Sequence, residues 1–228
     1  DSSIGGKTGI NSLSGKNLIG TFHHPSEVII DVSVLKTLSS RELRSGYSEI
    51  VKHSLIRDLR FFNWLNKNYK DLLKLKTKTL EAAISRSIRI KLSYVIKDQF
   101  ENLINKRSRA MLNFGHTFGH SLETFYKYDK KLNHGEAISI GMIIEAKISN
   151  KLGYLNKKDL DKIIDHFKKV KLKMYDKNIS NKNIIKNIIK DKKNILNKIN
   201  IVLLKNIGES FYKRDIGIEQ INKIIKNI

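Results

Sequence analysis

The chain has 228 residues, 40% of them hydrophobic, which is enough for one large domain or two small ones with a buried core. No run of eighteen apolar residues occurs and the first residues lack a signal-peptide pattern, so the sequence predicts a soluble, cytoplasmic protein with no membrane partner. Cysteine is absent, which excludes disulfides and thiolate zinc sites and leaves His, Asp and Glu to bind any metal.

The charge balance is strongly basic, with 44 Lys and Arg against 22 Asp and Glu. A net charge of +22 suggests a polyanionic partner such as nucleic acid. Residues 151–228, however, combine 20 basic and 8 acidic residues with many Ile and Asn, and no aromatic stacking platform is interleaved with the charge. This composition is typical of Lys at solvated surface positions, so we predict no nucleic-acid partner.

The first 31 residues differ in composition from the rest of the chain. They hold five of the 13 glycines and the only proline, Pro25, which predicts loops and short strands. Residues 26–31 (SEVIID) are the best strand candidate. Helical periodicity begins after Ser39, where Ser39 and Glu42 form a capping-box pattern and Tyr47, Val51 and Leu55 recur on one face.

Helices dominate the remainder. The pattern predicts helices over residues 71–97, 115–126, 134–152, 158–169 and 181–190, a short hairpin of 199–204 with 211–214, and a final helix over 218–228. We therefore predict a mainly α fold in two parts: a lead-in over residues 1–31, and a helical domain over residues 32–228.

Residues 1–9 (DSSIGGKTG) invite comparison with a phosphate-binding loop. A Walker motif needs Gly five positions before its Gly-Lys pair, where this chain has Asp1, so the nucleotide-hydrolase interpretation fails on spacing. Small residues still let a backbone approach an anion, and Lys7, Lys16 and Asn17 offer donors to one. A turn-rich connector without a ligand is the alternative.

Two clusters carry ionisable side chains. In the helix after Ser39, Glu49 lies three residues before Lys52, which by itself suggests an ordinary surface ion pair. Further on, His116 and His120 are four residues apart, and His134 follows closely with a carboxylate beside it. Two imidazoles with one carboxylate are typical of a catalytic zinc site, although histidines packed in a core are a common alternative.

Several motifs together resemble one family. They are DSSIGGKTG at residues 1–9, GKNLIGTFHHP at 15–25, REL at 41–43 followed by Gly46, Glu49 and Lys52, LNFGHTFGH at 112–120 and HGEA at 134–137. In this order they resemble the 3-dehydroquinate synthases. The resemblance implies conversion of 3-deoxy-D-arabino-heptulosonate 7-phosphate to 3-dehydroquinate and phosphate in the shikimate pathway. It also implies NAD, a zinc or cobalt ion, and a homodimer.

The resemblance assigns roles position by position. It implies metal ligation by Glu49, His116 and His134, and catalytic roles for Lys52 and for the proton acceptors His120 and Glu101. Substrate contacts fall on Lys7, Lys16, Asn17, Lys91, Arg109, Asn113 and the pair Lys192 and Lys193, and cofactor contacts on Asp1 and Thr37. A substrate with a carboxylate and a phosphate suits several cationic donors in fixed places.

One departure from the family bears on organisation. Its members carry an N-terminal Rossmann-like NAD domain, and no Gly-x-Gly-x-x-Gly motif follows a strand here. We therefore expect the chain to be the C-terminal portion, with the lead-in left over from that domain, and to show little activity alone. A related sugar-phosphate cyclase and a non-catalytic basic binding remnant are the alternatives.

Overall fold

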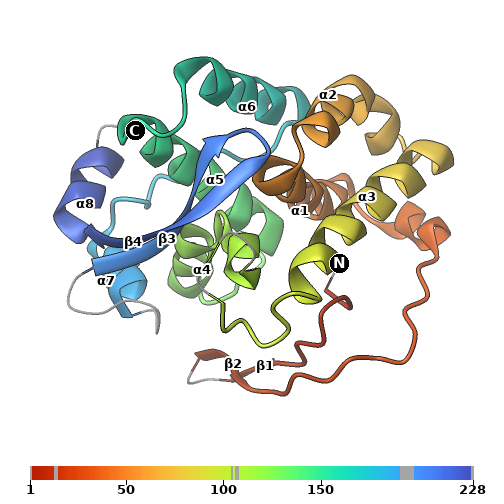
Figure 1. The fold of residues 1–228 in the computed structure, drawn as a ribbon, viewed down its shortest axis with the longest axis horizontal. Coiled ribbons are helices and arrows are strands. Elements are labelled where there is room, and N and C mark those ends of the chain that lie inside the picture. Colours follow the sequence, from red (N-terminus) through yellow and green to blue (C-terminus); the bar gives the residue numbers. More distant parts are fainter. Residues whose placement is uncertain (1, 13–14, 104, 106–107, 191–197, 227–228) are drawn as a thin grey trace.

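A computed structural model describes residues 2–12, 15–103, 105, 108–190 and 198–226. The helices are α1 (Ser40–Arg57), α2 (Leu59–Leu73), α3 (Thr77–Val95), α4 (His116–Phe125), α5 (His134–Lys151), α6 (Lys157–Val170), α7 (Lys182–Lys190) and α8 (Ile218–Lys226), with 3-10 helices η1 (Val32–Thr37) and η2 (Arg109–Asn113). Two antiparallel hairpins pair β1 (Ile10–Ser12) with β2 (Gly15–Ile19) and β3 (Lys198–Asn206) with β4 (Glu209–Gly217). The predicted mainly helical fold is confirmed (Figure 1).

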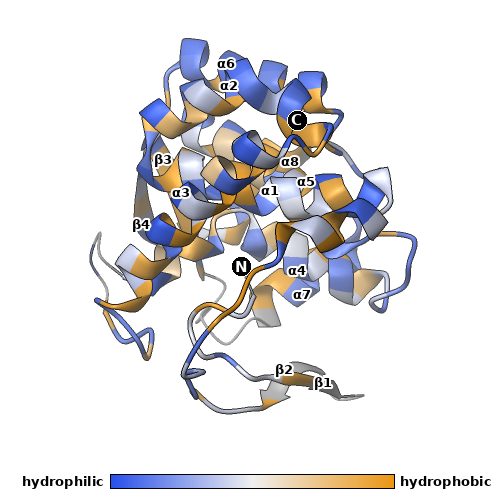
Figure 2. Ribbon diagram, turned by 90° about the vertical axis from the view of Figure 1, so that its right-hand side faces the viewer, coloured by the Kyte–Doolittle hydropathy of each residue, from blue (hydrophilic) through white to orange (hydrophobic). Residues whose placement is uncertain are grey.

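The lead-in forms loops and one small hairpin, β1 with β2, which stands apart from the helical body in Figure 2. The strand predicted over residues 26–31 is wrong, because this segment pairs with no described strand. The side chains of Ile29 and Ile30 are 83% and 45% exposed, so they are not packed against a core. The segment therefore has neither a paired strand for its backbone groups nor a buried face. The segment then enters η1, whose first turn is capped by Asp31.

Helix α1 begins where its sequence signal predicts. The Ser39 side chain accepts a hydrogen bond from the Glu42 amide, which satisfies one of the free donors of the first turn. Tyr47, Val51 and Leu55 are all buried on one face, as their spacing predicts. The opposite side of the same helix carries Glu49 toward a cleft.

The long helix predicted over residues 71–97 is wrong in its first part. Helix α2 ends at Leu73, Leu75 takes a φ of 56°, and α3 begins at Thr77. The prediction also missed most of α2, whose start is capped by Asp58 through the Phe61 amide. The break lets α3 turn back to pack against both α1 and α2 (Figure 1).

Helix α5 is the centre of the molecule. It contributes Ile138 and Met142 to a cluster under α1, α2, α3 and α6, and Ile140 and Ile144 to a second cluster that joins α4, α7, α8 and the β3–β4 hairpin. A helix that is apolar on every side is a buried helix. Figure 2 shows the apolar residues concentrated where the helices face one another.

The predictions for the second half of the chain are confirmed. The helices predicted over 115–126, 134–152, 158–169 and 181–190 are α4 to α7 within two residues at each end, and the predicted hairpin is β3–β4. The final helix is α8 as far as the structure describes it. None of the described helices combines the length and apolar composition needed to cross a bilayer.

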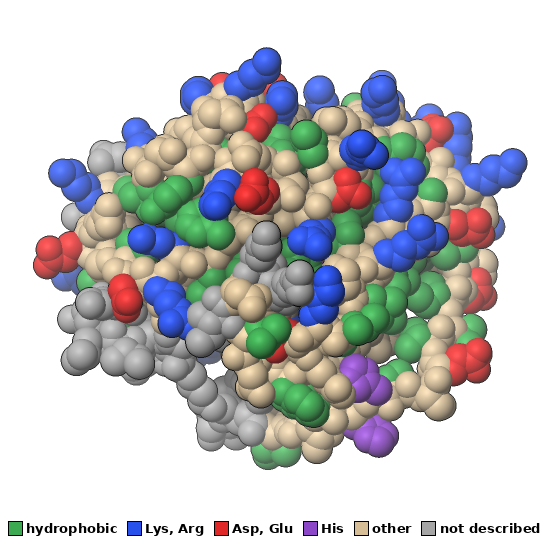
Figure 3. Space-filling view, in the orientation of Figure 1, with side chains coloured by type: hydrophobic (Ala, Val, Ile, Leu, Met, Phe, Trp, Pro, Cys, Tyr) green, Lys and Arg blue, Asp and Glu red, His purple; other side chains and the backbone are tan. Residues whose placement is uncertain are grey.

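The surface charge is dispersed on the face that Figure 3 shows. Lys and Arg side chains are spread across its upper part, with Asp and Glu among them. This is the distribution of solvated surface charge.

Candidate functional site

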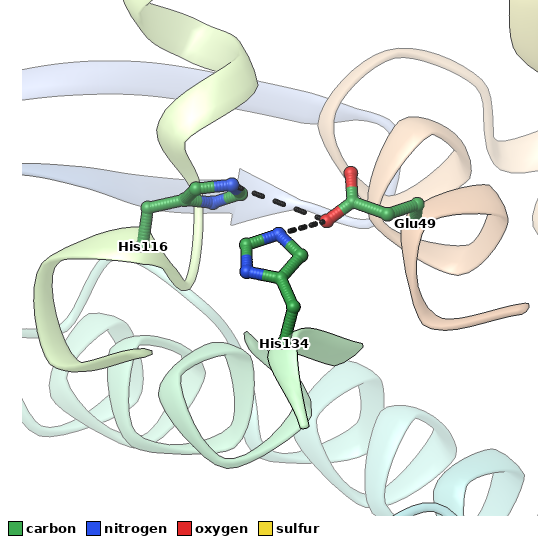
Figure 4. Close-up of side chains that lie close together, drawn as sticks. All are labelled: Glu49, His116 and His134. Carbon is green, nitrogen blue, oxygen red and sulfur yellow. Dashed lines mark ion pairs between the residues drawn. The ribbon is translucent and has the colours of Figure 1, made fainter. Parts of the chain in front are cut away.

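Three side chains from three helices converge on one point (Figure 4). Glu49 comes from α1, and His116 and His134 are the first residues of α4 and α5. The Nε2 atoms of His116 and His134 lie 3.9 and 3.6 Å from Oε1 of Glu49. One ligand atom from each residue lies within 4.8 Å of the others, so a single cation can contact all three.

Hydrogen bonds to Nδ1 of the His116 and His134 rings orient these imidazoles so that Nε2 points toward Glu49. Nδ1 of His116 donates to the carbonyl oxygen of Phe114 at 3.1 Å, and Nδ1 of His134 donates to Oε1 of Glu123 at 3.0 Å. In both rings the remaining nitrogen, Nε2, therefore faces Glu49 without its proton in the neutral form. Such outer contacts fix the tautomer of metal-binding imidazoles.

The carboxylate of Glu49 is the third group that could bind the metal. Its Oε2 is ion-paired with Lys52, while Oε1 is buried and has no hydrogen-bond partner among the described residues. A buried carboxylate oxygen without a partner is costly unless a cation meets it. Two nitrogens and one oxygen with an open fourth position suit zinc or cobalt.

The charges of the three groups depend on one another. Burial raises the pKa of Glu49, but Lys52 and the two imidazoles more than offset this and hold it well below its usual value. Burial, with Lys52 nearby, lowers the pKa of His116 well below 6.5. Burial also disfavours the charged form of His134, but the carboxylates of Glu123 and Glu49 raise its pKa to about 9. A metal ion that bound at this site would therefore displace a proton from His134.

A cleft of about 580 Å³ adjoins the three ligands. The predicted residues that line it are Lys7, Glu49, Lys52, Lys91, Arg109, Asn113, His116, His120 and His134. They come from the lead-in, α1, α3, η2, α4 and the start of α5. The tertiary structure therefore gathers cationic and amide donors beside Glu49, His116 and His134, an arrangement that suits an anionic ligand.

Glu101 connects two of the lining residues. Its Oε2 accepts from Nζ of Lys7 at 2.5 Å, and its Oε1 accepts from Nδ2 of Asn113 at 2.9 Å. Glu101 has a φ of 60°, an uncommon backbone conformation for a residue other than Gly. The carboxylate is thereby held at the edge of the cleft, close to the donors.

Two cations of the cleft are partly removed from water. Arg109 donates to the carbonyl oxygens of Gly5 at 2.8 Å and Gln99 at 2.9 Å, which ties the lead-in to η2. Burial lowers the pKa of Lys91 to about 8, and the positive charge of Lys52 adds to that effect. A cation with weakened hydration interacts more strongly with an incoming anion.

The other predicted site residues lie elsewhere or are not described. Lys16 and Asn17 belong to strand β2, in the hairpin at the edge of the molecule. Thr37 ends η1, where its hydroxyl donates to the carbonyl oxygen of Val34 at 2.8 Å. Next to it, Val34, Leu35 and Leu38 line a second, mostly apolar hollow that reaches Glu49 from the other side. Asp1, Lys192 and Lys193 lie outside the described residues.

The sequence analysis assigned no role to two residues of the site. Glu123 lies three residues after His120 and seven after His116, so it shares their helical face, and that spacing was the available signal. His53 is fully buried, lines the cleft, and has its Nδ1 2.6 Å from Oγ of Ser87. The contact with Ser87 joins α1 to α3 and could not be read from spacing.

Comparison with protein families matches the whole chain except its last part. Residues 1–45 match the model described as 3-dehydroquinate synthase N-terminal, and residues 46–194 match the model described as 3-dehydroquinate synthase C-terminal. The second match covers more than half of the chain.

Curated relatives agree with these models. The chain is 46% identical to the 3-dehydroquinate synthase of Pelagibacter ubique over 99% of this chain and 61% of the relative. It is 42% identical to that of Buchnera aphidicola subsp. Baizongia pistaciae over 100% of this chain and 63% of the relative. The chain thus spans about three fifths of the length of these relatives.

Solved structures share the fold over the full described chain. The 2-epi-5-epi-valiolone synthase of Streptomyces hygroscopicus subsp. jinggangensis, with NAD⁺ and Zn²⁺ bound, is 25% identical at a TM-score of 0.88 and is matched over 62% of its length. A 2-deoxy-scyllo-inosose synthase complexed with carbaglucose-6-phosphate, NAD⁺ and Co²⁺ is 25% identical at a TM-score of 0.82, over 63% of its length.

Proposed function

Because the chain belongs to the 3-dehydroquinate synthase family, we propose that it forms the metal- and substrate-binding part of an enzyme that converts 3-deoxy-D-arabino-heptulosonate 7-phosphate to 3-dehydroquinate and phosphate. The enzyme is an NAD- and metal-dependent lyase of the shikimate pathway. The observation that carries the proposal is the convergence of Glu49, His116 and His134 beside a cleft lined by cations.

In this proposal three residues bind the metal, and the residues that line the cleft bind the anionic groups of the substrate. A zinc or cobalt ion held by Glu49, His116 and His134 would polarise substrate oxygens. Lys52 keeps Glu49 ionised and oriented through their ion pair. Lys7, Lys91, Arg109 and Asn113 supply donors for the carboxylate and phosphate of the substrate. Lys16 and Asn17 of β2, with Lys192 or Lys193, complete this set in our proposal.

His120 and Glu101 are the proposed proton acceptors. His120 lines the cleft, and its ring meets that of His116 edge to face with centroids 5.0 Å apart. Its Nε2 lies 4.0 Å from Oε2 of Glu123, so a carboxylate is available to stabilise its protonated form. Glu101 accepts hydrogen bonds from two cleft residues, Lys7 and Asn113, and this contact with the cleft supports its role as the second acceptor.

The cofactor proposal rests on the lead-in and on the structural relatives. We assign residues 1–31 to the end of a dinucleotide-binding domain with substrate loops, and residues 32–228 to the helical domain. The match of residues 1–45 to the N-terminal family model supports this assignment. Asp1 and Thr37 would contact NAD, and the apolar hollow beside η1 offers space for part of it. We also propose that the enzyme is a cytoplasmic homodimer.

A related sugar-phosphate cyclase is the second candidate, because the structural relatives carry such names and share the fold. The intact enzyme, supplied with NAD and zinc, should release phosphate from 3-deoxy-D-arabino-heptulosonate 7-phosphate faster than from glucose 6-phosphate or sedoheptulose 7-phosphate. Replacing Glu49 by Gln should abolish this release, while Glu81→Gln on the exposed side of α3 should not. Faster release from either other sugar phosphate would favour the second candidate, and release from none would refute both.

A further inference from the structure

Glu145 is a fully buried carboxyl that the proposed function does not use. It lies in the middle of α5 and has no exposed surface. It is not among the described residues that line the cleft. A buried carboxyl is expensive to keep without hydrogen bonds, so its contacts indicate what it does.

The carboxyl of Glu145 meets the start of helix α4. Its Oε2 accepts a hydrogen bond from the Gly115 amide at 2.5 Å. Burial raises the pKa of Glu145 well above its usual value, and its Oε1 has no hydrogen-bond partner among the described residues. The backbone amides of Gly115, Thr117 and Phe118 and the Thr117 hydroxyl lie close enough to oppose that rise in part. These amides belong to the first turn of α4, where a helix has donors without partners of its own.

Helix α4 has no cap from its own sequence. Its N-cap residue, Gly115, offers no side chain and takes a φ of 83°. The side chain of a residue 30 positions further along the chain therefore bonds the N-cap amide, which is the task that Glu136 performs for α5 by accepting from the Asn133 amide.

Close packing of α4 on α5 makes this contact possible. A Cβ atom on Gly141 would lie 1.9 Å from the Gly115 carbonyl oxygen, and one on Gly119 would lie 2.6 Å from a methyl carbon of Ile138. The absence of side chains at these glycines lets the backbone of α4 lie directly against α5. Glu145 reaches the first turn from the same face of α5, one turn after Gly141.

The residue that follows the bonded Gly115 amide is His116. Its backbone lies between Gly115 and Thr117, and its ring is held by the carbonyl oxygen of Phe114. We propose that Glu145 is a positioning residue for His116: by capping α4 from α5, it sets where the imidazole points. The inference rests on the proposed metal-binding function and adds to it a residue that touches neither metal nor substrate.

The first test is zinc affinity, measured in the intact protein by competition with a chromophoric chelator. Glu145→Ala should weaken zinc binding at least about tenfold, in the range seen when outer contacts of a metal site are removed. Glu145→Gln keeps one carbonyl acceptor and should have a smaller effect. Ile143→Ala is the matched control, because it opens a cavity in the same helix within the core cluster that contains no residue of α4, and it should leave zinc affinity unchanged.

A double-mutant cycle identifies the ligand through which Glu145 acts. In a His116→Ala background, Glu145→Gln should cause no further loss of zinc affinity, while in a His134→Ala background its full effect should remain. An equal loss in both backgrounds would mean general loosening of the fold and would overturn the proposal, as would unchanged affinity in Glu145→Gln. If Glu145→Ala does not fold, the zinc affinities of Glu145→Gln and of the double-mutant cycle still test the proposal.

Hydrogen exchange gives a readout without metal. In the metal-free protein, Glu145→Gln should speed exchange at the amide of Gly115 and at the amides that follow it in the first turn of α4, and leave the first turn of α1 unaffected. Unchanged exchange at these amides would also overturn the proposal. Failure of the unsubstituted protein to bind zinc would instead refute the proposed function, so the two failures are distinguishable.

Discussion

Glu123 accepts a hydrogen bond from Nδ1 of His134 at 3.0 Å, and this contact decides which nitrogen of the ring faces Glu49. Glu123 lies on α4 and His134 begins α5, so the bond also links the two helices that carry the imidazoles. The Glu123 side chain is buried, which makes its charge more effective on a neighbouring ring. The pair is a carboxylate–histidine arrangement of the kind found behind metal ligands.

Removing this carboxylate should weaken metal binding. We expect Glu123→Ala to lower zinc affinity by about 10- to 100-fold, because His134 loses its fixed tautomer and orientation. Isothermal titration of zinc into the intact protein measures the change. Glu81→Gln, an exposed carboxylate change on α3, is the control and should bind zinc normally. Normal affinity in Glu123→Ala would mean that Glu123 does not orient the ring.

Zinc affinity should rise with pH. The pKa of His134 is raised to about 9, chiefly by Glu123 and Glu49, so below that pH zinc must displace its proton. His116 has a lowered pKa and is already neutral at pH 7. One displaced proton gives about a tenfold gain in affinity per pH unit up to about pH 9, followed by a plateau. A flat profile between pH 7 and pH 9 would contradict this.

Binding of an anion in the cleft should fall as pH rises through about 8. Burial lowers the pKa of Lys91 to about 8, and only its protonated form attracts an anion. Sulfate is a suitable probe because its own charge is constant in this range. Lys91→Gln should remove the pH dependence near pH 8 and weaken sulfate binding, while Lys97→Gln, an exposed change nearby, should preserve both. Persistence of the transition in Lys91→Gln would assign it to another group.

The two helical glycines Gly141 and Gly46 should respond oppositely to alanine. A Cβ on Gly141 would lie 1.9 Å from the Gly115 carbonyl oxygen, so Gly141→Ala must push α4 from α5 and should cost about 1–3 kcal/mol or more in the free energy of unfolding. A Cβ on Gly46 meets nothing within 4 Å. Gly46→Ala should therefore stabilise α1 by about 0.5–1 kcal/mol. Chemical denaturation measures both, and similar effects would contradict the packing described here.

Local sequence signals predicted most helices because those helices carry apolar faces, and several of them also carry their own caps. The start of α1 at Ser39 and the buried row of Tyr47, Val51 and Leu55 are examples. The predictions failed where a neighbour was needed. Residues 26–31 have a strand-like pattern but no described strand beside them, and the break at Leu75 depends on α3 packing back on α2.

The sequence by itself determined the chemical types available to the site: no thiol, a few histidines in two close motifs, and lysines in several separated segments. Its motifs also indicated the family. Only the tertiary structure decided that Glu49, His116 and His134 meet, that both imidazoles turn Nε2 inward, and that Glu123 and Glu145 support them. The physical reason is that these contacts join residues on different helices. Their distances are set by how α1, α4 and α5 pack, and spacing along the chain does not contain that information.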